Sequence, residues 1–574
     1  MTVPRPRLPW RAGAGATMEY TMSNAAATTT PVLIVGAGPV GLAMAIDLAY
    51  NGVPCTLVDQ GDGTIAHPKI GTIMTRTMEF FRRWGVVDQI RQSGFPDDYH
   101  LNILFCTSLT GYLLDKDCYP STADAPMPEG SPQKRQRCPQ TWLNPVLLER
   151  AKALPEVTLL LQHEFDAFSQ DENGVQATIK NGLTGETVSI AAEYLIGCDG
   201  AASLVREQLG FPMLGNPKLN YSIGILFRCP ELLSATGIGE LERVILVGEN
   251  GTWGNLTVID GKDYWRLTIF GSEERFKLEG FDAEKWIHQA LGKTDIPFEV
   301  LSIVPWRRTE LVAEHYRKGR VFLAGDSAHT MSPTGGMGVN TGFGDVWDLG
   351  WKIAAHRQGW GGETLLASYE LERRPVAVRN ASFSTHNFKH WQVPLDCSAI
   401  FTPGEEGDRV RRQIGETLKQ GTRSDWQSWG IQLGYRYENS PVCVPDGTPA
   451  PPDDYINYVQ TARPGHRAPH VWLDEGHARS SIDLFGREFV LMAFSQAGRD
   501  ALENWRRAAA QRGLPLRVES MDDPAMAALY AAPLVLVRPD GHVAWRGQPG
   551  ADAASIFDVV SGMTAAADSL VTQE

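Results

Sequence analysis

The stretch Val32-Leu-Ile-Val-Gly36-Ala-Gly38-Pro-Val-Gly41-Leu42 decides the fold of the first part of this chain. Its four leading apolar residues predict a buried strand, and the small and apolar residues that run on to Tyr50 predict a helix. The first glycine of this pattern allows a tight turn, the second lets the backbone approach a pyrophosphate, and the third lets helix pack on strand. The start of the helix then points free amides at an anion.

A second apolar run, residues 55–58, ends at Asp59, about twenty residues after the glycines. An acidic side chain at this position is suited to hydrogen-bond the 2′-hydroxyl of a ribose. Strand, turn, helix, second strand and acid in this order predict a dinucleotide site. A glycine-rich turn without a ligand is the alternative, and it leaves Asp59 unexplained. The motif alone does not distinguish FAD from NAD.

The 574 residues, 43% hydrophobic and 21% charged, have the composition of a globular protein of several domains. A net charge of −14 argues against a nucleic-acid partner. No apolar run approaches the roughly 18–20 residues of a membrane-spanning helix. The eight cysteines form no CxxC and no Cys/His pair at metal spacing, so we expect no metal, buried thiols and a cytoplasmic location. Residues 1–30 lack the apolar core of a signal peptide and are expected to be a disordered leader.

Two later segments repeat the pattern of a strand followed by a polar turn. In residues 194–206 an apolar strand ends at Asp199-Gly200, and Ser203 and Arg206 follow at helix spacing. In residues 319–340 a buried strand ends at Gly325-Asp326, and a glycine-rich turn then opens a helix at Thr341. Backbone amides at this second turn can cradle a polar ligand.

Between these segments the pattern favours a mostly antiparallel sheet. Strands are predicted at Ser222–Arg228, Val244–Val247, Trp253–Ile259 and Tyr264–Phe270. The sheet is rich in aromatic residues, which favours packing at any single position over the wall of an apolar pocket. Residues 97–136 are expected to make an irregular excursion over the surface.

The last part of the chain predicts a small α/β domain. Residues 400–470 are expected to be connectors, after a long helix near 360–389. From residue 471, strands and helices alternate over about 100 residues. The expected strands are 481–484, 488–494, 516–519, 534–538 and 542–546, and the expected helices are 500–512 and 553–566.

The three landmarks, in this order and spacing, resemble the class A flavin-dependent aromatic hydroxylases, the family of para-hydroxybenzoate hydroxylase and phenol hydroxylase. The resemblance covers residues 31–395, and Asp199-Gly200 is its most specific part. Later motifs at 434–437, 463–472 and 537–546 look like the larger phenol-type members, which carry a thioredoxin-like C-terminal domain. This chain has no CxxC there, which excludes dithiol chemistry and leaves a structural or interface role.

The resemblance implies an α/β fold with a Rossmann-like FAD-binding domain, an interleaved and mostly antiparallel substrate-domain sheet, and a thioredoxin-like domain. The FAD-binding domain would comprise residues 31–215 and 300–398, with part of the substrate domain inserted around 97–136. The substrate-binding sheet would comprise residues 216–299, the connector 399–470 and the last domain 471–574.

The same resemblance implies which residues bind FAD. Gly36, Gly38, Pro39 and Gly41 would hold the pyrophosphate, Asp59 and Gln60 the adenosine end, Asp326 the ribityl or pyrophosphate region, Gln140 the flavin, and Pro333, Gly338, Val339 and Asn340 the isoalloxazine edge. Asp199 would help both FAD and NAD(P)H. Lys69 and Arg76 are added because they are close enough in sequence to reach a phosphate. Met337, Lys69 and Asp59 stand where the family commonly has Gln, Arg and Glu.

The implied reaction uses NADPH or NADH to reduce FAD, and O2 to form a flavin C4a-hydroperoxide that hydroxylates a phenolic ring. A phenol reacts best as phenolate, so an acceptor should lie near its hydroxyl. His67 and Tyr221 are candidates, with Arg266 as an electrostatic stabiliser and Pro333 from the flavin loop. A surface histidine is the favoured interpretation of His67.

Several alternatives stay open. One is an aromatic polyketide hydroxylase of the same family, and others are a flavin oxidoreductase without oxygen insertion, a geranylgeranyl-type reductase, or a non-catalytic FAD-binding sensor. The sequence contains no second GxGxxG motif, so the choice between NADH and NADPH stays open. The predicted sheet holds only Arg228, Arg243 and Arg266, with no obvious pair for a carboxylate, which favours an uncharged or singly charged phenol. We expect no membrane partner and leave room for a homodimer.

Overall fold

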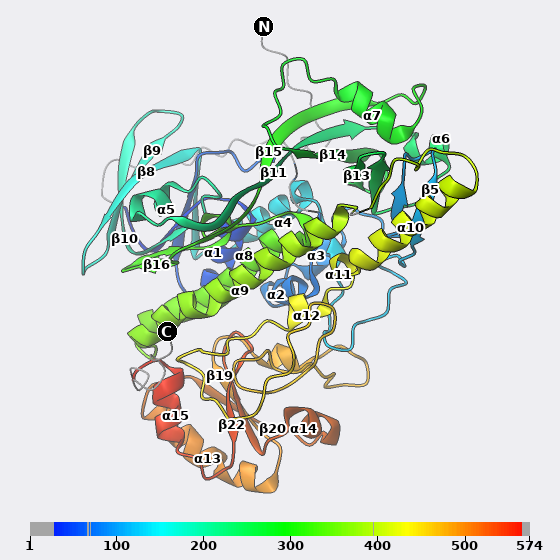
Figure 1. Ribbon diagram of the computed structural model, residues 1–574. Coiled ribbons are helices and arrows are strands. Elements are labelled where there is room, and N and C mark those ends of the chain that lie inside the picture. The colour runs from blue at the N-terminus through cyan, green and yellow to red at the C-terminus, as the bar shows by residue number, and fades with distance from the viewer. Residues whose placement is uncertain (1–27, 66–67, 69–70, 394, 565–574) are drawn as a thin grey trace.

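The computed structural model describes residues 28–65, 68, 71–393 and 395–564. Three sheets, each with its own helices, make up the molecule, and a two-stranded ladder of β3 (Thr72–Ile73) and β6 (Gln136–Arg137) is separate from them (Figure 1). In the part of the chain that the structure describes, no helix is both long and apolar enough to span a bilayer.

The first sheet has the order β16-β17-β10-β1-β2-β7, and β9 and β8 extend it from β10. Its strands are β1 (Thr28–Val35), β2 (Cys55–Asp59), β7 (Val157–Leu161), β8 (His163–Gln170), β9 (Val175–Asn181), β10 (Thr187–Gly197), β16 (Arg317–Lys318) and β17 (Val321–Leu323). The neighbours from β17 to β7 run parallel, as a Rossmann-like sheet requires.

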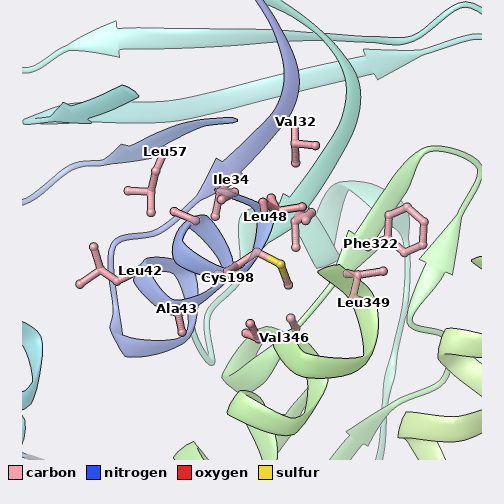
Figure 2. Packing of buried hydrophobic residues seen from close by; sticks show 14 of the residues in the cluster. Val32, Ile34, Leu42, Ala43, Leu48, Leu57, Cys198, Phe322, Val346 and Leu349 are labelled. Carbon is pink, nitrogen blue, oxygen red and sulfur yellow. The ribbon is translucent and has the colours of Figure 1, made fainter. Parts of the chain in front are cut away.

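Helices α1 (Pro39–Tyr50) and α8 (Met337–Arg357) cover this sheet. Figure 2 shows the core that joins them, where Val32 and Ile34 of β1 meet Leu42 of α1 and Val346 of α8. Nearly every residue of α1 is buried, because α4 (Gln140–Lys152) and α8 pack beside it. The strand–turn–helix unit predicted from residues 32–50 is therefore present, with the helix starting at Pro39.

The second sheet has the order β18-β15-β11-β14-β13-β12-β4-β5. Its strands are β4 (Ile103–Cys106), β5 (Leu113–Asp117), β11 (Met213–Arg228), β12 (Arg243–Gly248), β13 (Gly251–Val258), β14 (Tyr264–Ser272), β15 (Glu299–Ala313) and β18 (His329–Thr330). All pairings are antiparallel except β12 with β4. The prediction that residues 97–136 are irregular is wrong in part, because β4 and β5 complete this sheet.

One face of the second sheet is apolar and packs on α7 (Ala283–Leu291). Ile223 and Ile225 of β11 and Leu267 of β14 are fully buried against Ile287 and Leu291 of that helix. The opposite face is the one that matters for the site below.

The long helix predicted near 360–389 is present as the 29-residue α9 (Glu363–Trp391), which crosses the molecule beside α8 (Figure 1). Residues 400–470 are not only connectors, since α10 (Glu405–Gly421) buries Ile414 and Leu418 against Phe105 of β4. The shorter helices are α2 (Thr75–Trp84), α3 (Val87–Arg91), α5 (Leu204–Leu209), α6 (Leu232–Thr236), α11 (Arg423–Trp426) and α12 (Trp429–Leu433).

The third sheet has the order β20-β19-β21-β22 and lies next to α13 (Gln496–Ala510), α14 (Pro524–Tyr530) and α15 (Ala553–Val560) (Figure 1). Its strands are β19 (Phe489–Ala493), β20 (Leu516–Ser520), β21 (Leu534–Val537) and β22 (Val543–Gly547). The predicted pairing of the last two strands across Pro539-Asp-Gly541 is present. The strand predicted at 481–484 is instead a 3-10 turn.

Candidate cofactor and substrate site

The three glycines of the first loop differ in what surrounds them. A Cβ on Gly36 would lie 2.5 Å from the carbonyl oxygen of Cys198, and one on Gly41 would lie 1.8 Å from the carbonyl oxygen of Gly36. A Cβ on Gly38 would meet no atom within 4 Å. Gly36 and Gly41 are therefore required by the packing of the chain itself. Gly38 leaves open space at the start of α1, where helix amides and the helix dipole favour an anion.

Asp59 braces this loop from the end of β2. Its two carboxylate oxygens accept hydrogen bonds from the amides of Ala37 (2.6 Å) and Gly61 (2.7 Å). Pro39 is the first residue of α1, and Gln60 is exposed beside the carboxylate. The structure therefore gives Asp59 a role in shaping the loop as well as a position beside the predicted ribose site.

The second landmark, Asp199-Gly200, lies next to the first glycine loop, since a Cβ on Gly36 would be 3.0 Å from the Cα of Asp199. The Asp199 carboxylate accepts hydrogen bonds from Ser203 Oγ (2.6 Å) and the amide of Val205 (3.1 Å), so it holds the start of α5. Burial raises the pKa of Asp199. Arg206 donates to the carbonyl oxygen of Ser327 at 2.8 Å, which ties this landmark to the third.

The third landmark packs on α1. A Cβ on Gly325 would lie 2.9 Å from Val40, and Asp326 is exposed on the 3-10 turn that begins there. The buried Asp345 accepts from the amide of Gly325 (3.0 Å) and pairs with His329 (2.9 Å) and Arg373 (3.0 Å). Burial alone would raise the pKa of Asp345, but His329 and Arg373 hold it below its usual value.

The loop after Pro333 opens α8. Gly335 and Gly336 have φ values of 79° and 65°, in the left-handed region that favours glycine. Gly338 and Val339 lie in the first helical turn, where amides have no carbonyl partner within the helix. The Asn340 side chain accepts from the amide of Met74 (3.0 Å) and donates to the carbonyl oxygen of Gly336 (2.7 Å). Asn340 thus fixes the loop, and Pro333 is exposed on it.

The remaining predicted cofactor residues have different outcomes. Gln140 is buried at the first position of α4. Lys69 and the catalytic candidate His67 lie outside the described residues. The prediction for Arg76 is corrected: its guanidinium pairs with Glu79 at 2.6 Å and contacts Tyr435, so it belongs to a contact with the C-terminal part of the chain.

The other catalytic candidates, Tyr221 and Arg266, are on opposite faces of the second sheet. Successive side chains of a strand alternate between faces. Tyr221 therefore shares the apolar face with Ile223, and the structure does not bring it to Arg266. The Arg266 guanidinium donates to the carbonyl oxygen of Pro68 at 2.9 Å, within the segment that follows Asp59. Arg266 is thus beside the predicted cofactor region, and the assignment of Tyr221 as acceptor is not supported.

The face of the second sheet opposite α7 carries polar side chains beside apolar ones such as Ile245 and Val247, and we call its polar members the polar face. Its members are Asn220, Ser222, Arg243, Asn255, Thr257, Arg266, Thr268 and Arg308. Arg308 reaches the third landmark, because its Nη1 donates to Ser332 Oγ (2.6 Å) and Thr334 Oγ1 (3.2 Å). The polar face therefore adjoins the loop that opens α8.

Asp425 of α11 lies at the same junction. A Cβ on Gly335 would lie 3.4 Å from its Oδ1, and its Oδ2 accepts from the indole of Trp391 at 3.0 Å. Burial raises the pKa of Asp425 to about 6. Sequence reasoning missed both Asp425 and Arg308. Asp425 lay in a presumed connector, and Arg308 lies in β15, a segment for which no strand was predicted.

Comparison with known proteins identifies the family. The model of the FAD binding domain matches residues 29–384, and that of the aromatic-ring hydroxylase C-terminal region matches residues 461–567. A putative polyketide hydroxylase of Streptomyces halstedii is 35% identical over 90% of this chain and 93% of its own length. The 4-methyl-5-nitrocatechol 5-monooxygenase of a Burkholderia species is 32% identical over 90% of this chain and 94% of its own.

A solved structure agrees with these relatives. RebC, soaked with chromopyrrolic acid and with 7-carboxy-K252c bound, superposes with a TM-score of 0.87 at 39% identity, over 94% of this chain and 100% of that one. The chain belongs to the FAD-dependent aromatic hydroxylases. It is a flavoprotein monooxygenase with FAD as cofactor, and with O2 and a reduced nicotinamide as co-substrates. The family, fold class and cofactor predicted from the three landmarks are confirmed.

Proposed function

We propose that this enzyme hydroxylates a phenolic ring of a small aromatic compound, with NADH or NADPH as the electron donor. One observation carries the proposal: the open side of the first glycine loop, the Asp326 turn and the start of α8 come together beside a polar sheet face. A nitrocatechol monooxygenase among the relatives supports a phenolic substrate.

The residues present fit FAD. The space beside Gly38 suits the pyrophosphate, and the exposed Asp326 carboxylate can accept hydrogen bonds from the ribityl hydroxyls. The first turn of α8 offers amides to the flavin edge. When bound, FAD supplies the redox chemistry that activates O2. The chain supplies binding and electrostatics. Amides of Met337, Gly338 and Val339, at the positive end of the α8 dipole, stabilise negative charge at that edge.

The polar face and the aromatic residues of α9 would orient the substrate. Phe388 and Trp391 are nearly fully buried next to this face and exclude water from it. The acceptor of the phenolic proton stays a prediction, with His67 outside the described residues. Asp59, Asp199 and the other cofactor residues named above are proposals of the same standing.

An aromatic polyketide hydroxylase is a second candidate, which the Streptomyces relative favours. A flavin oxidoreductase without oxygen insertion is the third. The three differ in what the products contain, so the decisive measurement is the transfer of ¹⁸O from ¹⁸O2 to an aromatic product, over a panel of phenols and polycyclic phenols.

The purified protein should be yellow, and a phenol in the panel should accelerate its oxidation of NADH or NADPH. Gly38→Val places a branched side chain where the pyrophosphate is expected, so it should lose FAD while keeping its fold by circular dichroism. The hydroxylase proposal fails if the protein holds FAD and yet no aromatic compound accelerates nicotinamide oxidation or gains ¹⁸O.

Location and assembly are also proposals. All eight cysteines are free, which supports a reducing compartment such as the cytoplasm. The homodimer stays a prediction.

A further inference from the structure

A cavity of about 230 Å³ lies between the cofactor-binding part and the C-terminal part of the chain, which lies below α2 in Figure 1. One side is formed by α1, α2 and α8, which contribute Tyr50, Arg83 and Trp347. The other side is formed by the C-terminal part, which contributes Phe485 and Gly541. The remaining lining residues are Arg76, Glu79, Ile482, Asp483 and Asp540.

The cavity is large enough for a small organic ligand. An apolar protein cavity of about 150 Å³ holds benzene, so this one has room for a single ring with one substituent. It is also separate from the predicted cofactor site. Among the described residues, Arg76 alone of those first expected to bind FAD lines it, and that assignment is corrected above.

The carboxylates that line the cavity are already paired with arginines. The pairs are Glu79 with Arg76 (2.6 Å) and Arg467 (2.5 Å), Asp483 with Arg82 (2.8 Å), and Asp540 with Arg538 (2.5 Å). These pairs offset the negative charge of the cavity wall.

Arg83 is the lining cation that lacks such a pair. Among the described residues, no carboxylate forms an ion pair with it, and its guanidinium makes one hydrogen bond, from Nη1 to the carbonyl oxygen of Pro539 at 3.0 Å. Burial lowers the pKa of Arg83 to about 10, against smaller opposing effects of Tyr50, Asp47 and Asp540. Burial also raises the pKa of Asp47 to about 7, so near neutral pH this carboxylate is ionised only in part.

An aromatic ring fixes the orientation of this free cation. The Arg83 guanidinium carbon lies 3.7 Å from the ring centroid of Trp347 and 5.9 Å from that of Tyr50. Stacking on a ring sets the plane of a guanidinium and leaves its edge able to donate to an anion. The cavity therefore combines one oriented, unpaired cation with the apolar side chains of Ile482 and Phe485.

We infer that this cavity binds a small aromatic carboxylate as a second ligand of the enzyme, apart from FAD and from the ring that is hydroxylated. The carboxylate accepts hydrogen bonds from Arg83, and the ring lies against Ile482 and Phe485. A monoanion fits better than a phosphate ester, because one unpaired cation matches one negative charge and a phosphate ester carries nearly two. Since both parts of the chain form the walls, the ligand strengthens the contact between them.

The test is a calorimetric titration of the FAD-loaded enzyme with 4-iodobenzoate, 4-iodobenzamide and inorganic phosphate. The acid should bind tenfold or more tightly than the amide or phosphate. Flavin absorbance reports binding beside the flavin separately. Crystals soaked in 4-iodobenzoate should show the anomalous signal of iodine in the cavity between Arg83 and Phe485.

Two variants test charge and shape independently. Arg83→Gln should abolish the preference for the acid over the amide, a loss of about tenfold or more in affinity for the acid. Ile482→Trp fills the cavity and keeps every charge, so it should weaken the binding of acid and amide alike. Both variants should retain FAD. The matched control is Arg506→Gln, because Arg506 is exposed on α13 and pairs with Glu503 at 3.5 Å, and it should leave the affinity unchanged.

The inference is overturned if the acid binds no more tightly than the amide or inorganic phosphate, or if both variants bind the acid as the wild type does. It is also overturned if iodine is found only beside the loop that opens α8. The proposed function is tested separately, by ¹⁸O transfer to an aromatic product.

Discussion

Two groups of arginines in this protein differ in their partners: a sheet group in which Arg308 is buried and Arg243 and Arg266 are half-buried, and an interface group that is buried throughout. The sheet group, Arg243, Arg266 and Arg308, has no carboxylate partner among the described residues. The interface group, Arg76, Arg467 and Arg538, has one for every guanidinium: Glu79 lies 2.6 Å from Arg76 and 2.5 Å from Arg467, and Glu372 lies 2.5 Å from Arg538. The paired charges of the interface group hold parts of the chain together, whereas the sheet group contributes no such ion pair.

The interface group joins the C-terminal part of the chain to α2, through Glu79, and to the long helix α9, through Glu372. Arg538, at the end of β21, also pairs with Asp540, and Glu372 of α9 accepts from Lys352 of α8 at 2.5 Å as well. All four side chains are almost completely buried. Figure 1 shows the third sheet below these helices. The C-terminal part, which lacks a CxxC, therefore has an architectural link to the cofactor-binding part.

The largest expected effect follows from breaking the paired group. Arg538→Met leaves Glu372 and Asp540 buried without that cation, so the free energy of unfolding should fall by about 3–5 kcal/mol. Thermal unfolding of the holoprotein, followed by circular dichroism, measures the change. Arg512→Met is the control on the same domain, because its pair with Asp558 is partly exposed and should be worth about 1 kcal/mol or less. Equal midpoints for the two variants would contradict the architectural role.

The sequence predicted FAD and the strand–turn–helix units around its expected site because these are specified by residues within short stretches. Each motif can be recognised from a few neighbouring residues: the glycine loop, Asp59, Asp199-Gly200 and the Asp326 turn. The parallel sheet brings these motifs together, because each follows the end of one of its strands. The structure shows which of the three loop glycines the packing of the chain itself requires. Gly36 and Gly41 are needed by the fold, and only Gly38 faces open space.

The substrate side was not predictable in the same way. Arg243, Arg266 and Arg308 come from strands far apart in the sequence, and their shared face depends on register, which sequence alone left open. Arg76 shows the reverse error. Its position near the glycine loop in the sequence suggested a phosphate contact, but helix α2 carries its side chain to Glu79 and the C-terminal part of the chain.

A second prediction concerns Asp425, a buried carboxylate that interacts electrostatically with Arg243 and Arg308. Burial raises its pKa from 3.8 to about 6, against opposing effects of Arg243 and the Trp391 hydrogen bond and with a further increase from Glu242. The folded state then keeps a proton that the unfolded chain has lost between pH 3.8 and 6. Stability therefore falls as pH rises through that window, by about 3 kcal/mol in total.

Asp425→Asn removes this loss, so the variant should unfold at a higher temperature than the wild type at pH 7.5 and at a similar temperature at pH 4. Asp453→Asn is the control of opposite sign. The hydrogen bond from Arg379 holds the pKa of Asp453 below its usual value, so that variant should lose stability at pH 7.5. Parallel pH profiles for the wild type and Asp425→Asn would show that Asp425 is ionised as readily in the folded state as in the unfolded chain.

The smallest expected effect is the sharpest test of the comparison. Arg243→Met removes a charge that has no acidic partner, so it relieves repulsion within the sheet group while giving up the contacts with Trp391 and Trp426. These terms offset, and the free energy of unfolding should change by less than about 1 kcal/mol, against 3–5 kcal/mol for the same substitution at Arg538. Thermal midpoints of the two Met variants, measured side by side without substrate, decide the matter. If Arg243→Met costs as much as Arg538→Met, Arg243 supports the fold as strongly as a buried ion pair does, and the contrast between the two groups fails.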